Sequence, residues 1–228
     1  MDKSMYNKIE EYMLSCMKDG AHDCQHIYRV LYHALDIARD YDVDKNVLIA
    51  AALLHDIGRE AQFQNPQMDH ATVGADMAYD FLIKLGWADD KAQHVKACIA
   101  THRFRTGTPP ASMEAKILYD SDKLDATGLL GIARTIAYKG IVAQPLYNVD
   151  NEGFVLLEDD DNNPSFFQEY HFKLKKVYDM FYTDQARSIA ESRRSAAESF
   201  YNSLYNEVIT THNTGVGLLK NDFEDQNI

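Results

Sequence analysis

The stretch Leu53-Leu54-His55-Asp56-Ile57-Gly58-Arg59 places two polar side chains directly after an apolar run. The run begins at Ala50 and predicts a buried helix that the glycine brings to an end. An imidazole and a carboxylate buried beside two leucines need a partner that satisfies them. A divalent metal ion is one such partner, because carboxylate and neutral imidazole are both good ligands. A hydrogen-bonded His-Asp pair at an ordinary helix end is the alternative, so this stretch alone leaves two interpretations.

The bulk properties of the chain are those of a water-soluble globular protein. It has 228 residues, of which 46% are hydrophobic and 25% charged, enough for one sizeable core. The formal net charge of -12 argues against binding to a nucleic-acid polymer or a membrane surface, since both depend on basic patches. A small phosphorylated substrate remains compatible with this charge, because a few local arginines beside a metal suffice for it.

Cysteine use and the N-terminal residues indicate a cytoplasmic protein. Cys16, Cys24 and Cys98 are scattered and odd in number, and no CxxC spacing occurs. The sequence therefore predicts neither a disulfide framework nor a thiolate zinc site. The N-terminal residues lack the apolar core of a signal peptide, and no apolar run approaches the length that spans a membrane. The sequence leaves open whether the chain forms a homo-oligomer.

Helical periodicity dominates the chain and predicts an all-α fold. Apolar residues recur at three- and four-residue spacing from Met5 onwards, while no convincing set of strands is present. Four polar residues stand where helices should begin and are predicted N-caps: Asp23, Asp44, Asp69 and Thr183. We expect the first helix to end near Gly20, a polar loop to follow Gly58, a helix to run from about Tyr170 to Phe181, and a last helix to continue to about Val208.

One stretch, from about residue 141 to residue 163, does not read as a helix. Its proline, glycine, asparagine and acidic residues favour a long loop, with a short hairpin around Asn151-Glu152-Gly153. We therefore expect a single all-α domain over residues 1–214. It would comprise a core of about 22–140, an irregular insertion of about 141–163 and C-terminal helices of about 165–212. A polar tail would follow over 215–228.

Six side chains with nitrogen or oxygen ligand atoms lie at the ends or on single faces of the predicted buried helices. They are His26, His55, Asp56, His70, His102 and Asp122. A set of this kind suits Mn, Fe, Ni, Mg or Zn better than a thiolate set would. His70 falls in the first turn of its helix, where the helix dipole disfavours a protonated imidazole and so favours the form that binds metal.

The order of these residues resembles the signature of the HD superfamily of metal-dependent phosphohydrolases. The family's His, His-Asp and Asp are met as His26, His55-Asp56 and Asp122, and the contexts His26-Ile27-Tyr28-Arg29-Val30 and Asp120-Ser121-Asp122-Lys123-Leu124-Asp125-Ala126 are similar too. The resemblance covers roughly residues 22–140 and implies an HD-type helical bundle. Leu130-Gly131-Ile132-Ala133-Arg134 and Thr183-Asp184-Gln185-Ala186-Arg187 resemble one bacterial subgroup of nucleotide-cleaving or uncharacterised HD hydrolases.

This resemblance implies that His26, His55, Asp56 and Asp122 ligate one divalent metal ion. His70 and His102 match less universal positions. They would complete a second metal site bridged by Asp56, contact the substrate phosphate, or simply pack. His22, beside the matched His26, has a predicted substrate or supporting role. The remaining histidines match nothing in the family, and no functional role is predicted for them: His33, His94, His171 and His212.

Basic and acidic residues near these motifs supply candidates for substrate binding and proton transfer. Arg29, Arg59 and Arg134 are predicted to bind phosphate, since a guanidinium binds it bidentately. Lys123 neighbours a ligand and is expected to point away from the site. Asp56 and Asp125 are the predicted catalytic carboxylates. Asp125, one turn from Asp122, would orient a ligand or accept a proton from water, and a helix-cap role is the alternative.

The predicted chemistry is metal-assisted hydrolysis of a phosphorylated small molecule. The resemblance implies a nucleotide as substrate, with cleavage of a nucleoside triphosphate to monophosphate and pyrophosphate as one form of the reaction. Two other classes compete. Some HD proteins hold a di-iron centre with six ligands in the order found here and cleave C–C or C–P bonds with oxygen. A non-catalytic nucleotide-sensing module is the third reading, disfavoured because every core ligand is present.

Overall fold

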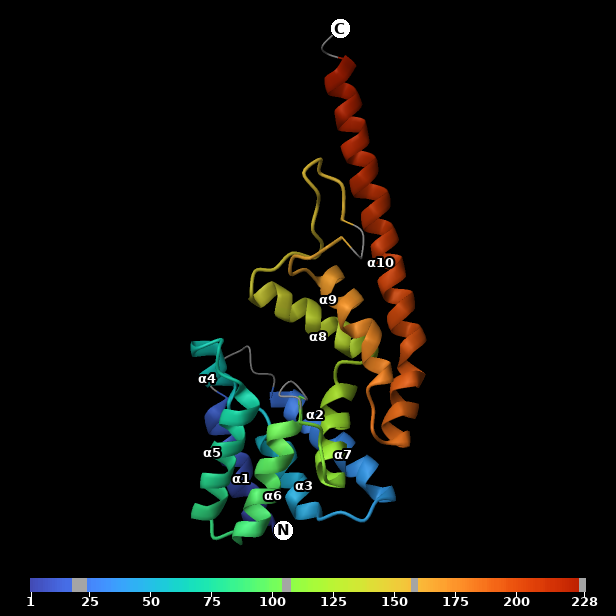
Figure 1. Ribbon diagram of the computed structural model, residues 1–228. Helices are drawn as coiled ribbons and strands as arrows, with labels where there is room; N and C mark the ends of the chain where they lie inside the picture. The colour runs from blue at the N-terminus through green and yellow to red at the C-terminus, as the bar shows by residue number, and fades with distance from the viewer. Residues whose placement is uncertain (18–23, 104–107, 157–159, 226–228) are drawn as a thin grey trace. The chain divides into compact units, whose positions relative to one another are not determined.

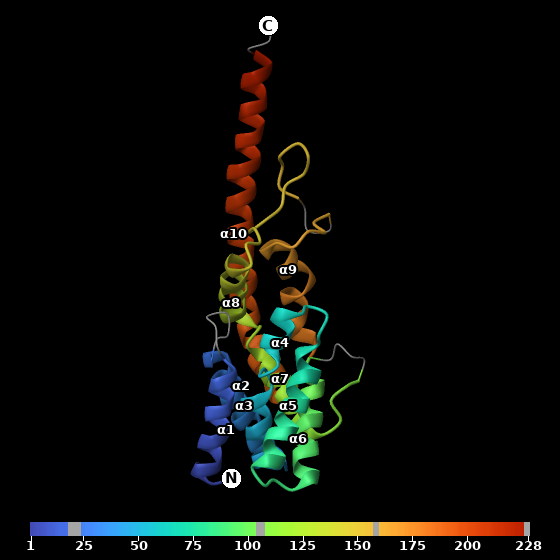
Figure 2. The ribbon, with the colours of Figure 1, turned by 90° about the vertical axis from the view of Figure 1, so that its left-hand side faces the viewer.

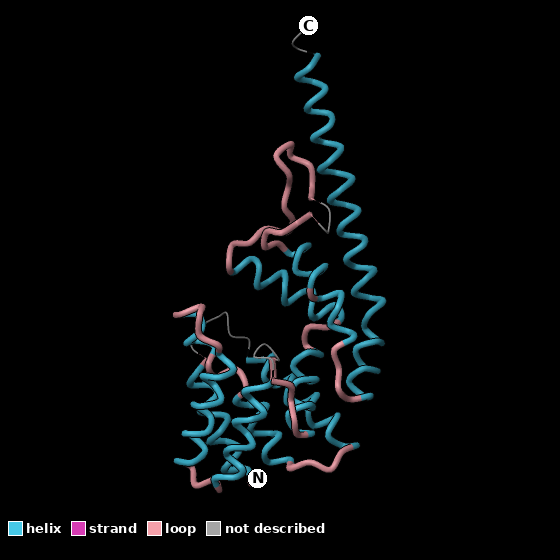
Figure 3. The backbone as a smooth tube through the Cα atoms, viewed as in Figure 1, coloured by secondary structure: helices cyan, strands magenta, loops and turns pink. Residues whose placement is uncertain are grey.

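The protein is mainly helical in the part of the chain that a computed structural model describes, residues 1–17, 24–103, 108–156 and 160–225 (Figures 1 and 2). Within those ranges the backbone forms no strand, and an isolated antiparallel bridge joins Val149 to Val155 (Figure 3). The predicted all-α fold is confirmed. No helix in the described ranges is long and apolar enough to cross a membrane.

The chain divides into two compact units. The first comprises Met1–Asp125 with Phe181–Ser188, and the second comprises Ala126–Met180 with Ile189–Ile228. The chain passes from the first unit to the second directly after Asp125, at the end of the segment that contains the His, His-Asp and Asp motifs. All six predicted ligands therefore belong to the first unit. The expectation that residues 1–214 form a single domain stays a prediction.

The first unit is a bundle of helices, coloured from blue to yellow-green in Figure 1 apart from the beginning of α10, which is orange. They are α1 (Lys3–Cys16), α2 (Cys24–Ile37), the 3-10 turn η1 (Ala38–Asp40), α3 (Lys45–Leu54), α4 (Arg59–Gln64), α5 (His70–Lys84), α6 (Asp89–Thr101) and α7 (Met113–Leu124), with the beginning of α10 (Asp184–Asp225). Asp44 and Asp69 cap α3 and α5 through hydrogen bonds from backbone amides, as predicted. Gly20 and Asp23, predicted to end one helix and begin the next, lie outside the described residues.

Helix α3 occupies the middle of this bundle. Seven of its ten residues are buried, and it packs against α1, α2, α5, α6 and α7. A helix that is apolar on every side is stable only in such a position. Because α3 ends at Leu54, its C-terminal end delivers His55 and Asp56 into the interior, where both side chains are almost completely buried.

Gly58 allows the turn after His55-Asp56 to lie directly against α5. A Cβ atom at Gly58 would lie 2.3 Å from the carbonyl oxygen of His70 and 2.6 Å from the amide nitrogen of Gly74. The backbone of Gly58 is helical, with φ of -84°, so a close approach, not a left-handed conformation, requires glycine here. The polar loop expected after Gly58 is wrong in part, because residues 59–64 form the short helix α4.

The second unit consists of α8 (Gly128–Ile141), α9 (Phe166–Phe172), the 3-10 helix η2 (Leu174–Asp179) and the rest of α10. Its core is aromatic and includes Phe166, Phe167 and the stacked pair of Tyr170 and Tyr201, whose ring centroids are 3.7 Å apart. The prediction of one helix from about Tyr170 to Phe181 is wrong. Helix α9 ends at Phe172, and a tighter 3-10 segment follows it.

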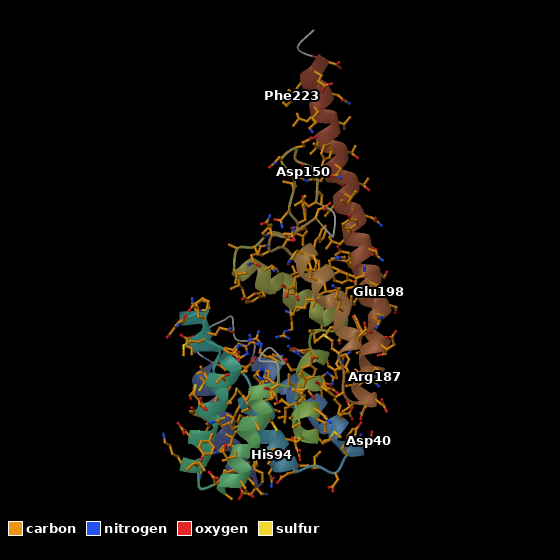
Figure 4. The ribbon with its side chains drawn as sticks, viewed as in Figure 1. Asp40, His94, Asp150, Arg187, Glu198 and Phe223 are labelled. Atoms are coloured by element: carbon orange, nitrogen blue, oxygen red, sulfur yellow. The ribbon has the colours of Figure 1, made fainter. Side chains whose placement is uncertain are left out.

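The predicted hairpin in the irregular stretch is confirmed by the bridge between Val149 and Val155. Asp150, labelled in Figure 4, accepts hydrogen bonds from the backbone amides of Glu152 and Phe154 and so shapes the turn. Helix α10 continues to Asp225, beyond the end near Val208 that was expected for the last helix, and the polar tail over 215–228 stays a prediction. Lys220 on α10 forms an ion pair with Glu152 of the hairpin and lies over the Phe154 ring.

Candidate metal centre

Five elements of the first unit bring the six predicted ligands together. His26 lies on α2, His55 and Asp56 follow α3, His70 is the first residue of α5, His102 directly follows α6, and Asp122 lies in the last turn of α7. All of these residues except His26 lie at or directly after a helix end, where a side chain can reach the interior without being part of the apolar stripe. The four histidines and Asp56 are buried, with at most 5% of each residue exposed.

Asp56 stands between two groups of nitrogen atoms. Its Oδ2 atom lies 3.5 Å from Nε2 of His26 and 3.5 Å from Nε2 of His55, and the two Nε2 atoms are 3.3 Å apart. The Oδ1 atom of Asp122 approaches Nε2 of His26 at 3.4 Å. These four residues are the predicted ligands of the first metal ion, and the structure brings all four together. We call them the His26 group.

The other oxygen of Asp56 faces a different pair of histidines. Its Oδ1 atom lies 3.3 Å from Nε2 of His70 and 3.7 Å from Nε2 of His102. Asp56, His70 and His102 form the His70 group, whose three ligand atoms lie within 4.8 Å of one another. One carboxylate therefore contributes one oxygen atom to each group, which is the arrangement that a bridging ligand requires.

Every histidine of the centre has its Nδ1 atom held by an acceptor outside the centre. The acceptors are the carbonyl oxygen of Ala52 for His55 (2.8 Å), the carbonyl oxygen of Ile99 for His102 (2.6 Å), Oε1 of Gln62 for His70 (2.5 Å) and Oδ2 of Asp125 for His26 (2.7 Å). For His55 and His102, whose acceptors are carbonyl oxygens, this places the proton of the neutral imidazole on Nδ1 and leaves the lone pair on Nε2. The Nε2 atoms of all four histidines face the Asp56 carboxylate, as in metal-binding histidines.

Three buried atoms at the centre have no aligned hydrogen-bond partner among the described residues: Asp56 Oδ1, His70 Nε2 and His102 Nε2. Buried polar atoms without a partner are rare, and each is destabilising. A divalent cation would satisfy all three at once, and a donor set of imidazole nitrogen and carboxylate oxygen suits Mn, Fe, Ni or Zn. The residues therefore fit a metal ion on their own chemistry.

The pKa values of the centre follow from burial and from its charges. Burial lowers the pKa of His55 and that of His70 to about 4, so both are neutral at pH 7. Burial also opposes protonation of His26, but hydrogen bonds to Asp122, Asp125 and Asp56 together raise its pKa to about 10. Burial favours the neutral form of Asp56, yet Arg59 and the surrounding imidazoles hold the pKa of that carboxyl well below its usual range. A metal ion at the His26 group would therefore compete with a proton.

Of the predicted phosphate ligands, Arg59 and Arg29 contact the centre through carboxylates. Nε of Arg59 lies 2.7 Å from Oδ2 of Asp56, and 40% of the Arg59 side chain is exposed. Arg29 binds Asp125 with two hydrogen bonds. Arg134 lies on α8 in the second unit, and its role stays a prediction. His22 lies outside the described residues, and so does its predicted role.

Sequence reasoning missed two neighbours of the His70 group and misplaced one lysine. Gln62 and Arg103 both contact Nδ1 of His70, and the position of Arg103 directly after His102 was the available signal. The expectation that Lys123 points away is wrong, because its Nζ atom lies 3.2 Å from Oδ2 of Asp122 and over the Tyr119 ring. His94, for which no functional role was predicted, contacts Ser112 and Glu114 at the start of α7 (Figure 4).

Comparisons with known proteins agree with this geometry. The family model of the HD domain matches residues 24–127. The Bacillus subtilis protein YpgQ is 28% identical over 207 residues, which are 88% of this chain and 92% of that protein. A crystal structure of YpgQ in complex with ADP has a TM-score of 0.69 at 26% identity and covers 89% of this chain and 97% of that one.

Two further solved structures are described as HD-superfamily hydrolases. The one from Bacillus thuringiensis is 28% identical, with a TM-score of 0.68, and covers 90% of this chain and 97% of its own. The one from an uncultured Thermotogales bacterium, a predicted hydrolase, is 29% identical, with a TM-score of 0.60, and covers 88% and 91%. The similarity therefore extends beyond the motif region to most of each chain.

Proposed function

Since this chain belongs to the HD-domain superfamily of metal-dependent phosphohydrolases, we propose that its substrate is a nucleotide. The specific reaction we propose is hydrolysis of a nucleoside triphosphate to the monophosphate and pyrophosphate. Support for a nucleotide comes from YpgQ, a similar protein whose crystal structure contains ADP. The acidic chain, with a formal net charge of -12, favours a small substrate over a polymer.

The observation that carries the proposal is the position of Asp56 between the His26 group and the His70 group, with three buried atoms of the His70 group lacking an aligned hydrogen-bond partner among the described residues. A bound divalent cation lowers the pKa of water towards neutrality and polarises a phosphoryl oxygen. His26, His55, Asp56 and Asp122 would hold the first ion. His70 and His102, with the other oxygen of Asp56, would hold a second ion or contact the substrate phosphate.

The protein's own charges would bind and orient the phosphate. Arg59 is ion-paired with Asp56 and partly exposed, so its guanidinium can contact a phosphate oxygen beside the centre. A guanidinium has five N–H donors in a fixed plane, which suits simultaneous contact with a carboxylate and a phosphate. Arg103, whose guanidinium lies 2.9 Å from Nδ1 of His70, adds a second positive charge on the side of the His70 group.

The carboxylates divide into one that meets the reacting centre and one that supports it. Asp56 contacts both groups of histidines and is ionised, so we assign it to metal binding and catalysis. Asp125 lies 2.7 Å from Nδ1 of His26 and binds Arg29 through both of its oxygen atoms. Of the roles predicted for Asp125, orienting a ligand agrees best with these contacts.

Metal analysis of the purified protein together with a nucleotide panel tests the proposal. With Mn or Mg under nitrogen, we expect at least one nucleoside triphosphate to yield monophosphate and pyrophosphate, detected by phosphorus NMR. Asp56→Asn should lose this activity. The control Asp76→Asn should retain it, since Asp76 is exposed and pairs with Lys96 on the surface of the first unit. Absence of any phosphorus product from every nucleotide tried would refute the proposal.

A di-iron oxygenase remains the second candidate, because all six ligands that such a centre uses converge here. The His70 group is the feature that favours it, since a hydrolase with one essential ion does not require that group. The two candidates differ in their second substrate, which is water for the hydrolase and oxygen for the oxygenase. A requirement for both iron and oxygen would favour the oxygenase, and turnover under nitrogen with a redox-inert metal would exclude it.

A further inference from the structure

The four histidines of the centre differ in the group that holds Nδ1. His55 and His102 donate to backbone carbonyl oxygens, and Nδ1 of His70 lies between the neutral amide of Gln62 and the guanidinium of Arg103. His26 alone meets a carboxylate, that of Asp125, which is completely buried. An ionised acceptor makes the imidazole a stronger electron donor at Nε2 than a neutral acceptor does, and it holds the ring more firmly.

Arg29 holds the Asp125 carboxylate in place. Its Nε atom lies 2.7 Å from Oδ1 of Asp125 and its Nη2 atom lies 3.0 Å from Oδ2. This two-point pairing fixes the plane of the carboxylate. A carboxylate fixed in this way cannot rotate toward the position that a metal ion would occupy, so it stays bound to Nδ1 of His26.

The spacing of these residues makes the four side chains a single unit. His26 and Arg29 are one turn apart on α2, while Asp122 and Asp125 are separated by the same three residues at the end of α7. Residues three apart share one face of a helix. Asp122 therefore meets Nε2 of His26 and Asp125 meets Nδ1 of the same ring, at 3.4 and 2.7 Å.

We propose that Asp125 and Arg29 are positioning residues that strengthen metal binding by the His26 group, and that Gln62 does the same for the His70 group. The inference rests on the proposed function, because it presumes a divalent ion at this centre. It assigns the two groups separate supports on different elements, α7 with α2 for the first and α4 for the second. Each support should then act on one group and leave the other unchanged.

Titration of the metal-free protein with Mn by calorimetry, without nucleotide, tests this assignment. Asp125→Asn should weaken the tightest site about 10- to 100-fold, the range for loss of a residue that supports a metal-binding histidine. Arg29→Gln should weaken the same site by a smaller factor. Gln62→Leu should leave that site unchanged and weaken only a second, looser site where one is measured. The Nδ1 proton of His26 should also shift in the NMR spectrum of Asp125→Asn.

Asp120→Asn is the matched control. Asp120 is a completely buried carboxylate on the same helix, and it binds the backbone amides of Tyr182 and Thr183. Its variant should lower the unfolding temperature without changing the metal affinity of the folded protein. A purely structural role for Asp125 predicts the same pattern for Asp125→Asn, and that result would overturn the inference. If Asp125→Asn does not fold, Arg29→Gln carries the test.

Three outcomes separate the positioning role of Asp125 and Arg29 from substrate binding by Arg29 and from failure of the proposed function. If Arg29→Gln keeps the metal affinity but raises KM for the nucleotide, Arg29 binds substrate phosphate and its positioning role is refuted. If the wild-type protein binds no divalent ion at all, the proposed function fails. If the wild-type protein binds the ion and Asp125→Asn binds it equally well, the positioning role of Asp125 is refuted and the proposed function is not.

Discussion

Replacing Gly58 by alanine should separate the His-Asp turn from α5 and disturb the His70 group. The new Cβ atom would lie 2.3 Å from the carbonyl oxygen of His70 and 2.6 Å from the amide nitrogen of Gly74, whereas ordinary contact begins at 3.4 Å. The two backbones must therefore move apart by about 1 Å. Overpacking typically destabilises a protein by about 1–3 kcal/mol. Because both obstructing atoms are backbone, we expect a loss in the free energy of unfolding near the upper end, about 3 kcal/mol.

Urea denaturation of the metal-free protein measures this loss, and two other glycines provide a graded comparison. A Cβ atom at Gly74 would lie 3.2 Å from the amide nitrogen of Gly58, so Gly74→Ala should destabilise the protein less. No atom lies within 4 Å of a Cβ at Gly140 in α8, and Gly140→Ala should raise helix stability by about 0.5–1 kcal/mol.

Metal titration of Gly58→Ala completes the experiment. His70 begins α5, and its Nε2 atom lies 3.3 Å from Oδ1 of Asp56. A displaced α5 should therefore weaken binding by the His70 group more than binding by the His26 group. If Gly58→Ala matched the wild type in both unfolding and metal binding, the close approach would not position His70, and this reasoning would be refuted.

Four further predictions follow from the centre. His55→Ala or Asp56→Ala should abolish metal retention and activity, because each removes a ligand that no neighbour replaces; metal analysis that found full occupancy in either variant would contradict the assignment. Arg59→Ala should weaken nucleotide binding or turnover by about 1.5–3 kcal/mol, the range for a hydrogen bond to a charged group. Arg59→Lys should recover only part of this loss, and steady-state kinetics measures both variants. If the protein is a hydrolase, His70→Ala and His102→Ala should lower the rate of nucleotide hydrolysis, but phosphate or pyrophosphate should still be released with added Mn or Mg. If the protein is an oxygenase, the same variants should lose all turnover. Metal binding at pH 7 should release a proton from His26, because its pKa of about 10 lies above the pH. It should release none from His55, whose pKa is about 4. The metal affinity should therefore rise as the pH increases towards 10, and calorimetry in buffers of different ionisation enthalpy measures the number of protons released.

The candidate ligands could be predicted from the sequence because their signals are local. An apolar run that ends in His55-Asp56 and an aspartate cap directly before His70 mark the helix ends of the centre whatever lies around them. The family resemblance then indicated that these distant motifs contribute ligands to the same metal centre. The structure brings the six residues together as expected, and the three described caps, Asp44, Asp69 and Thr183, are confirmed.

The parts that could not be predicted depend on contacts between distant segments. Helix α4 has six residues and none of them is buried, so it offers no apolar stripe to detect. Gln62 reaches His70 only because that helix forms. In α10, Gly215 and Gly217 argue locally against a helix, yet α10 continues past both. Near its end Phe223, labelled in Figure 4, is 56% exposed. Periodicity therefore predicts core helices better than peripheral ones.

The spacing of the acidic residues on α7 explains why one imidazole can meet two carboxylates. Three residues along a helix advance it by about 4.5 Å, so Asp122 and Asp125 lie on adjacent turns and reach opposite nitrogens of His26. The same spacing on α2 places Arg29 beside the second carboxylate, at 2.7 Å. A buried charge without a partner is strongly destabilising, and each group here has one: Arg29 pairs with Asp125, and His26 lies between Asp122 and Asp125. These four side chains therefore stabilise one another in the metal-free protein. A divalent ion in place of the proton on His26 would add one positive charge, which the Asp56 carboxylate, 3.5 Å from Nε2 of His26, can balance. One set of side chains can therefore be compatible with both the metal-free fold and the metal-bound centre.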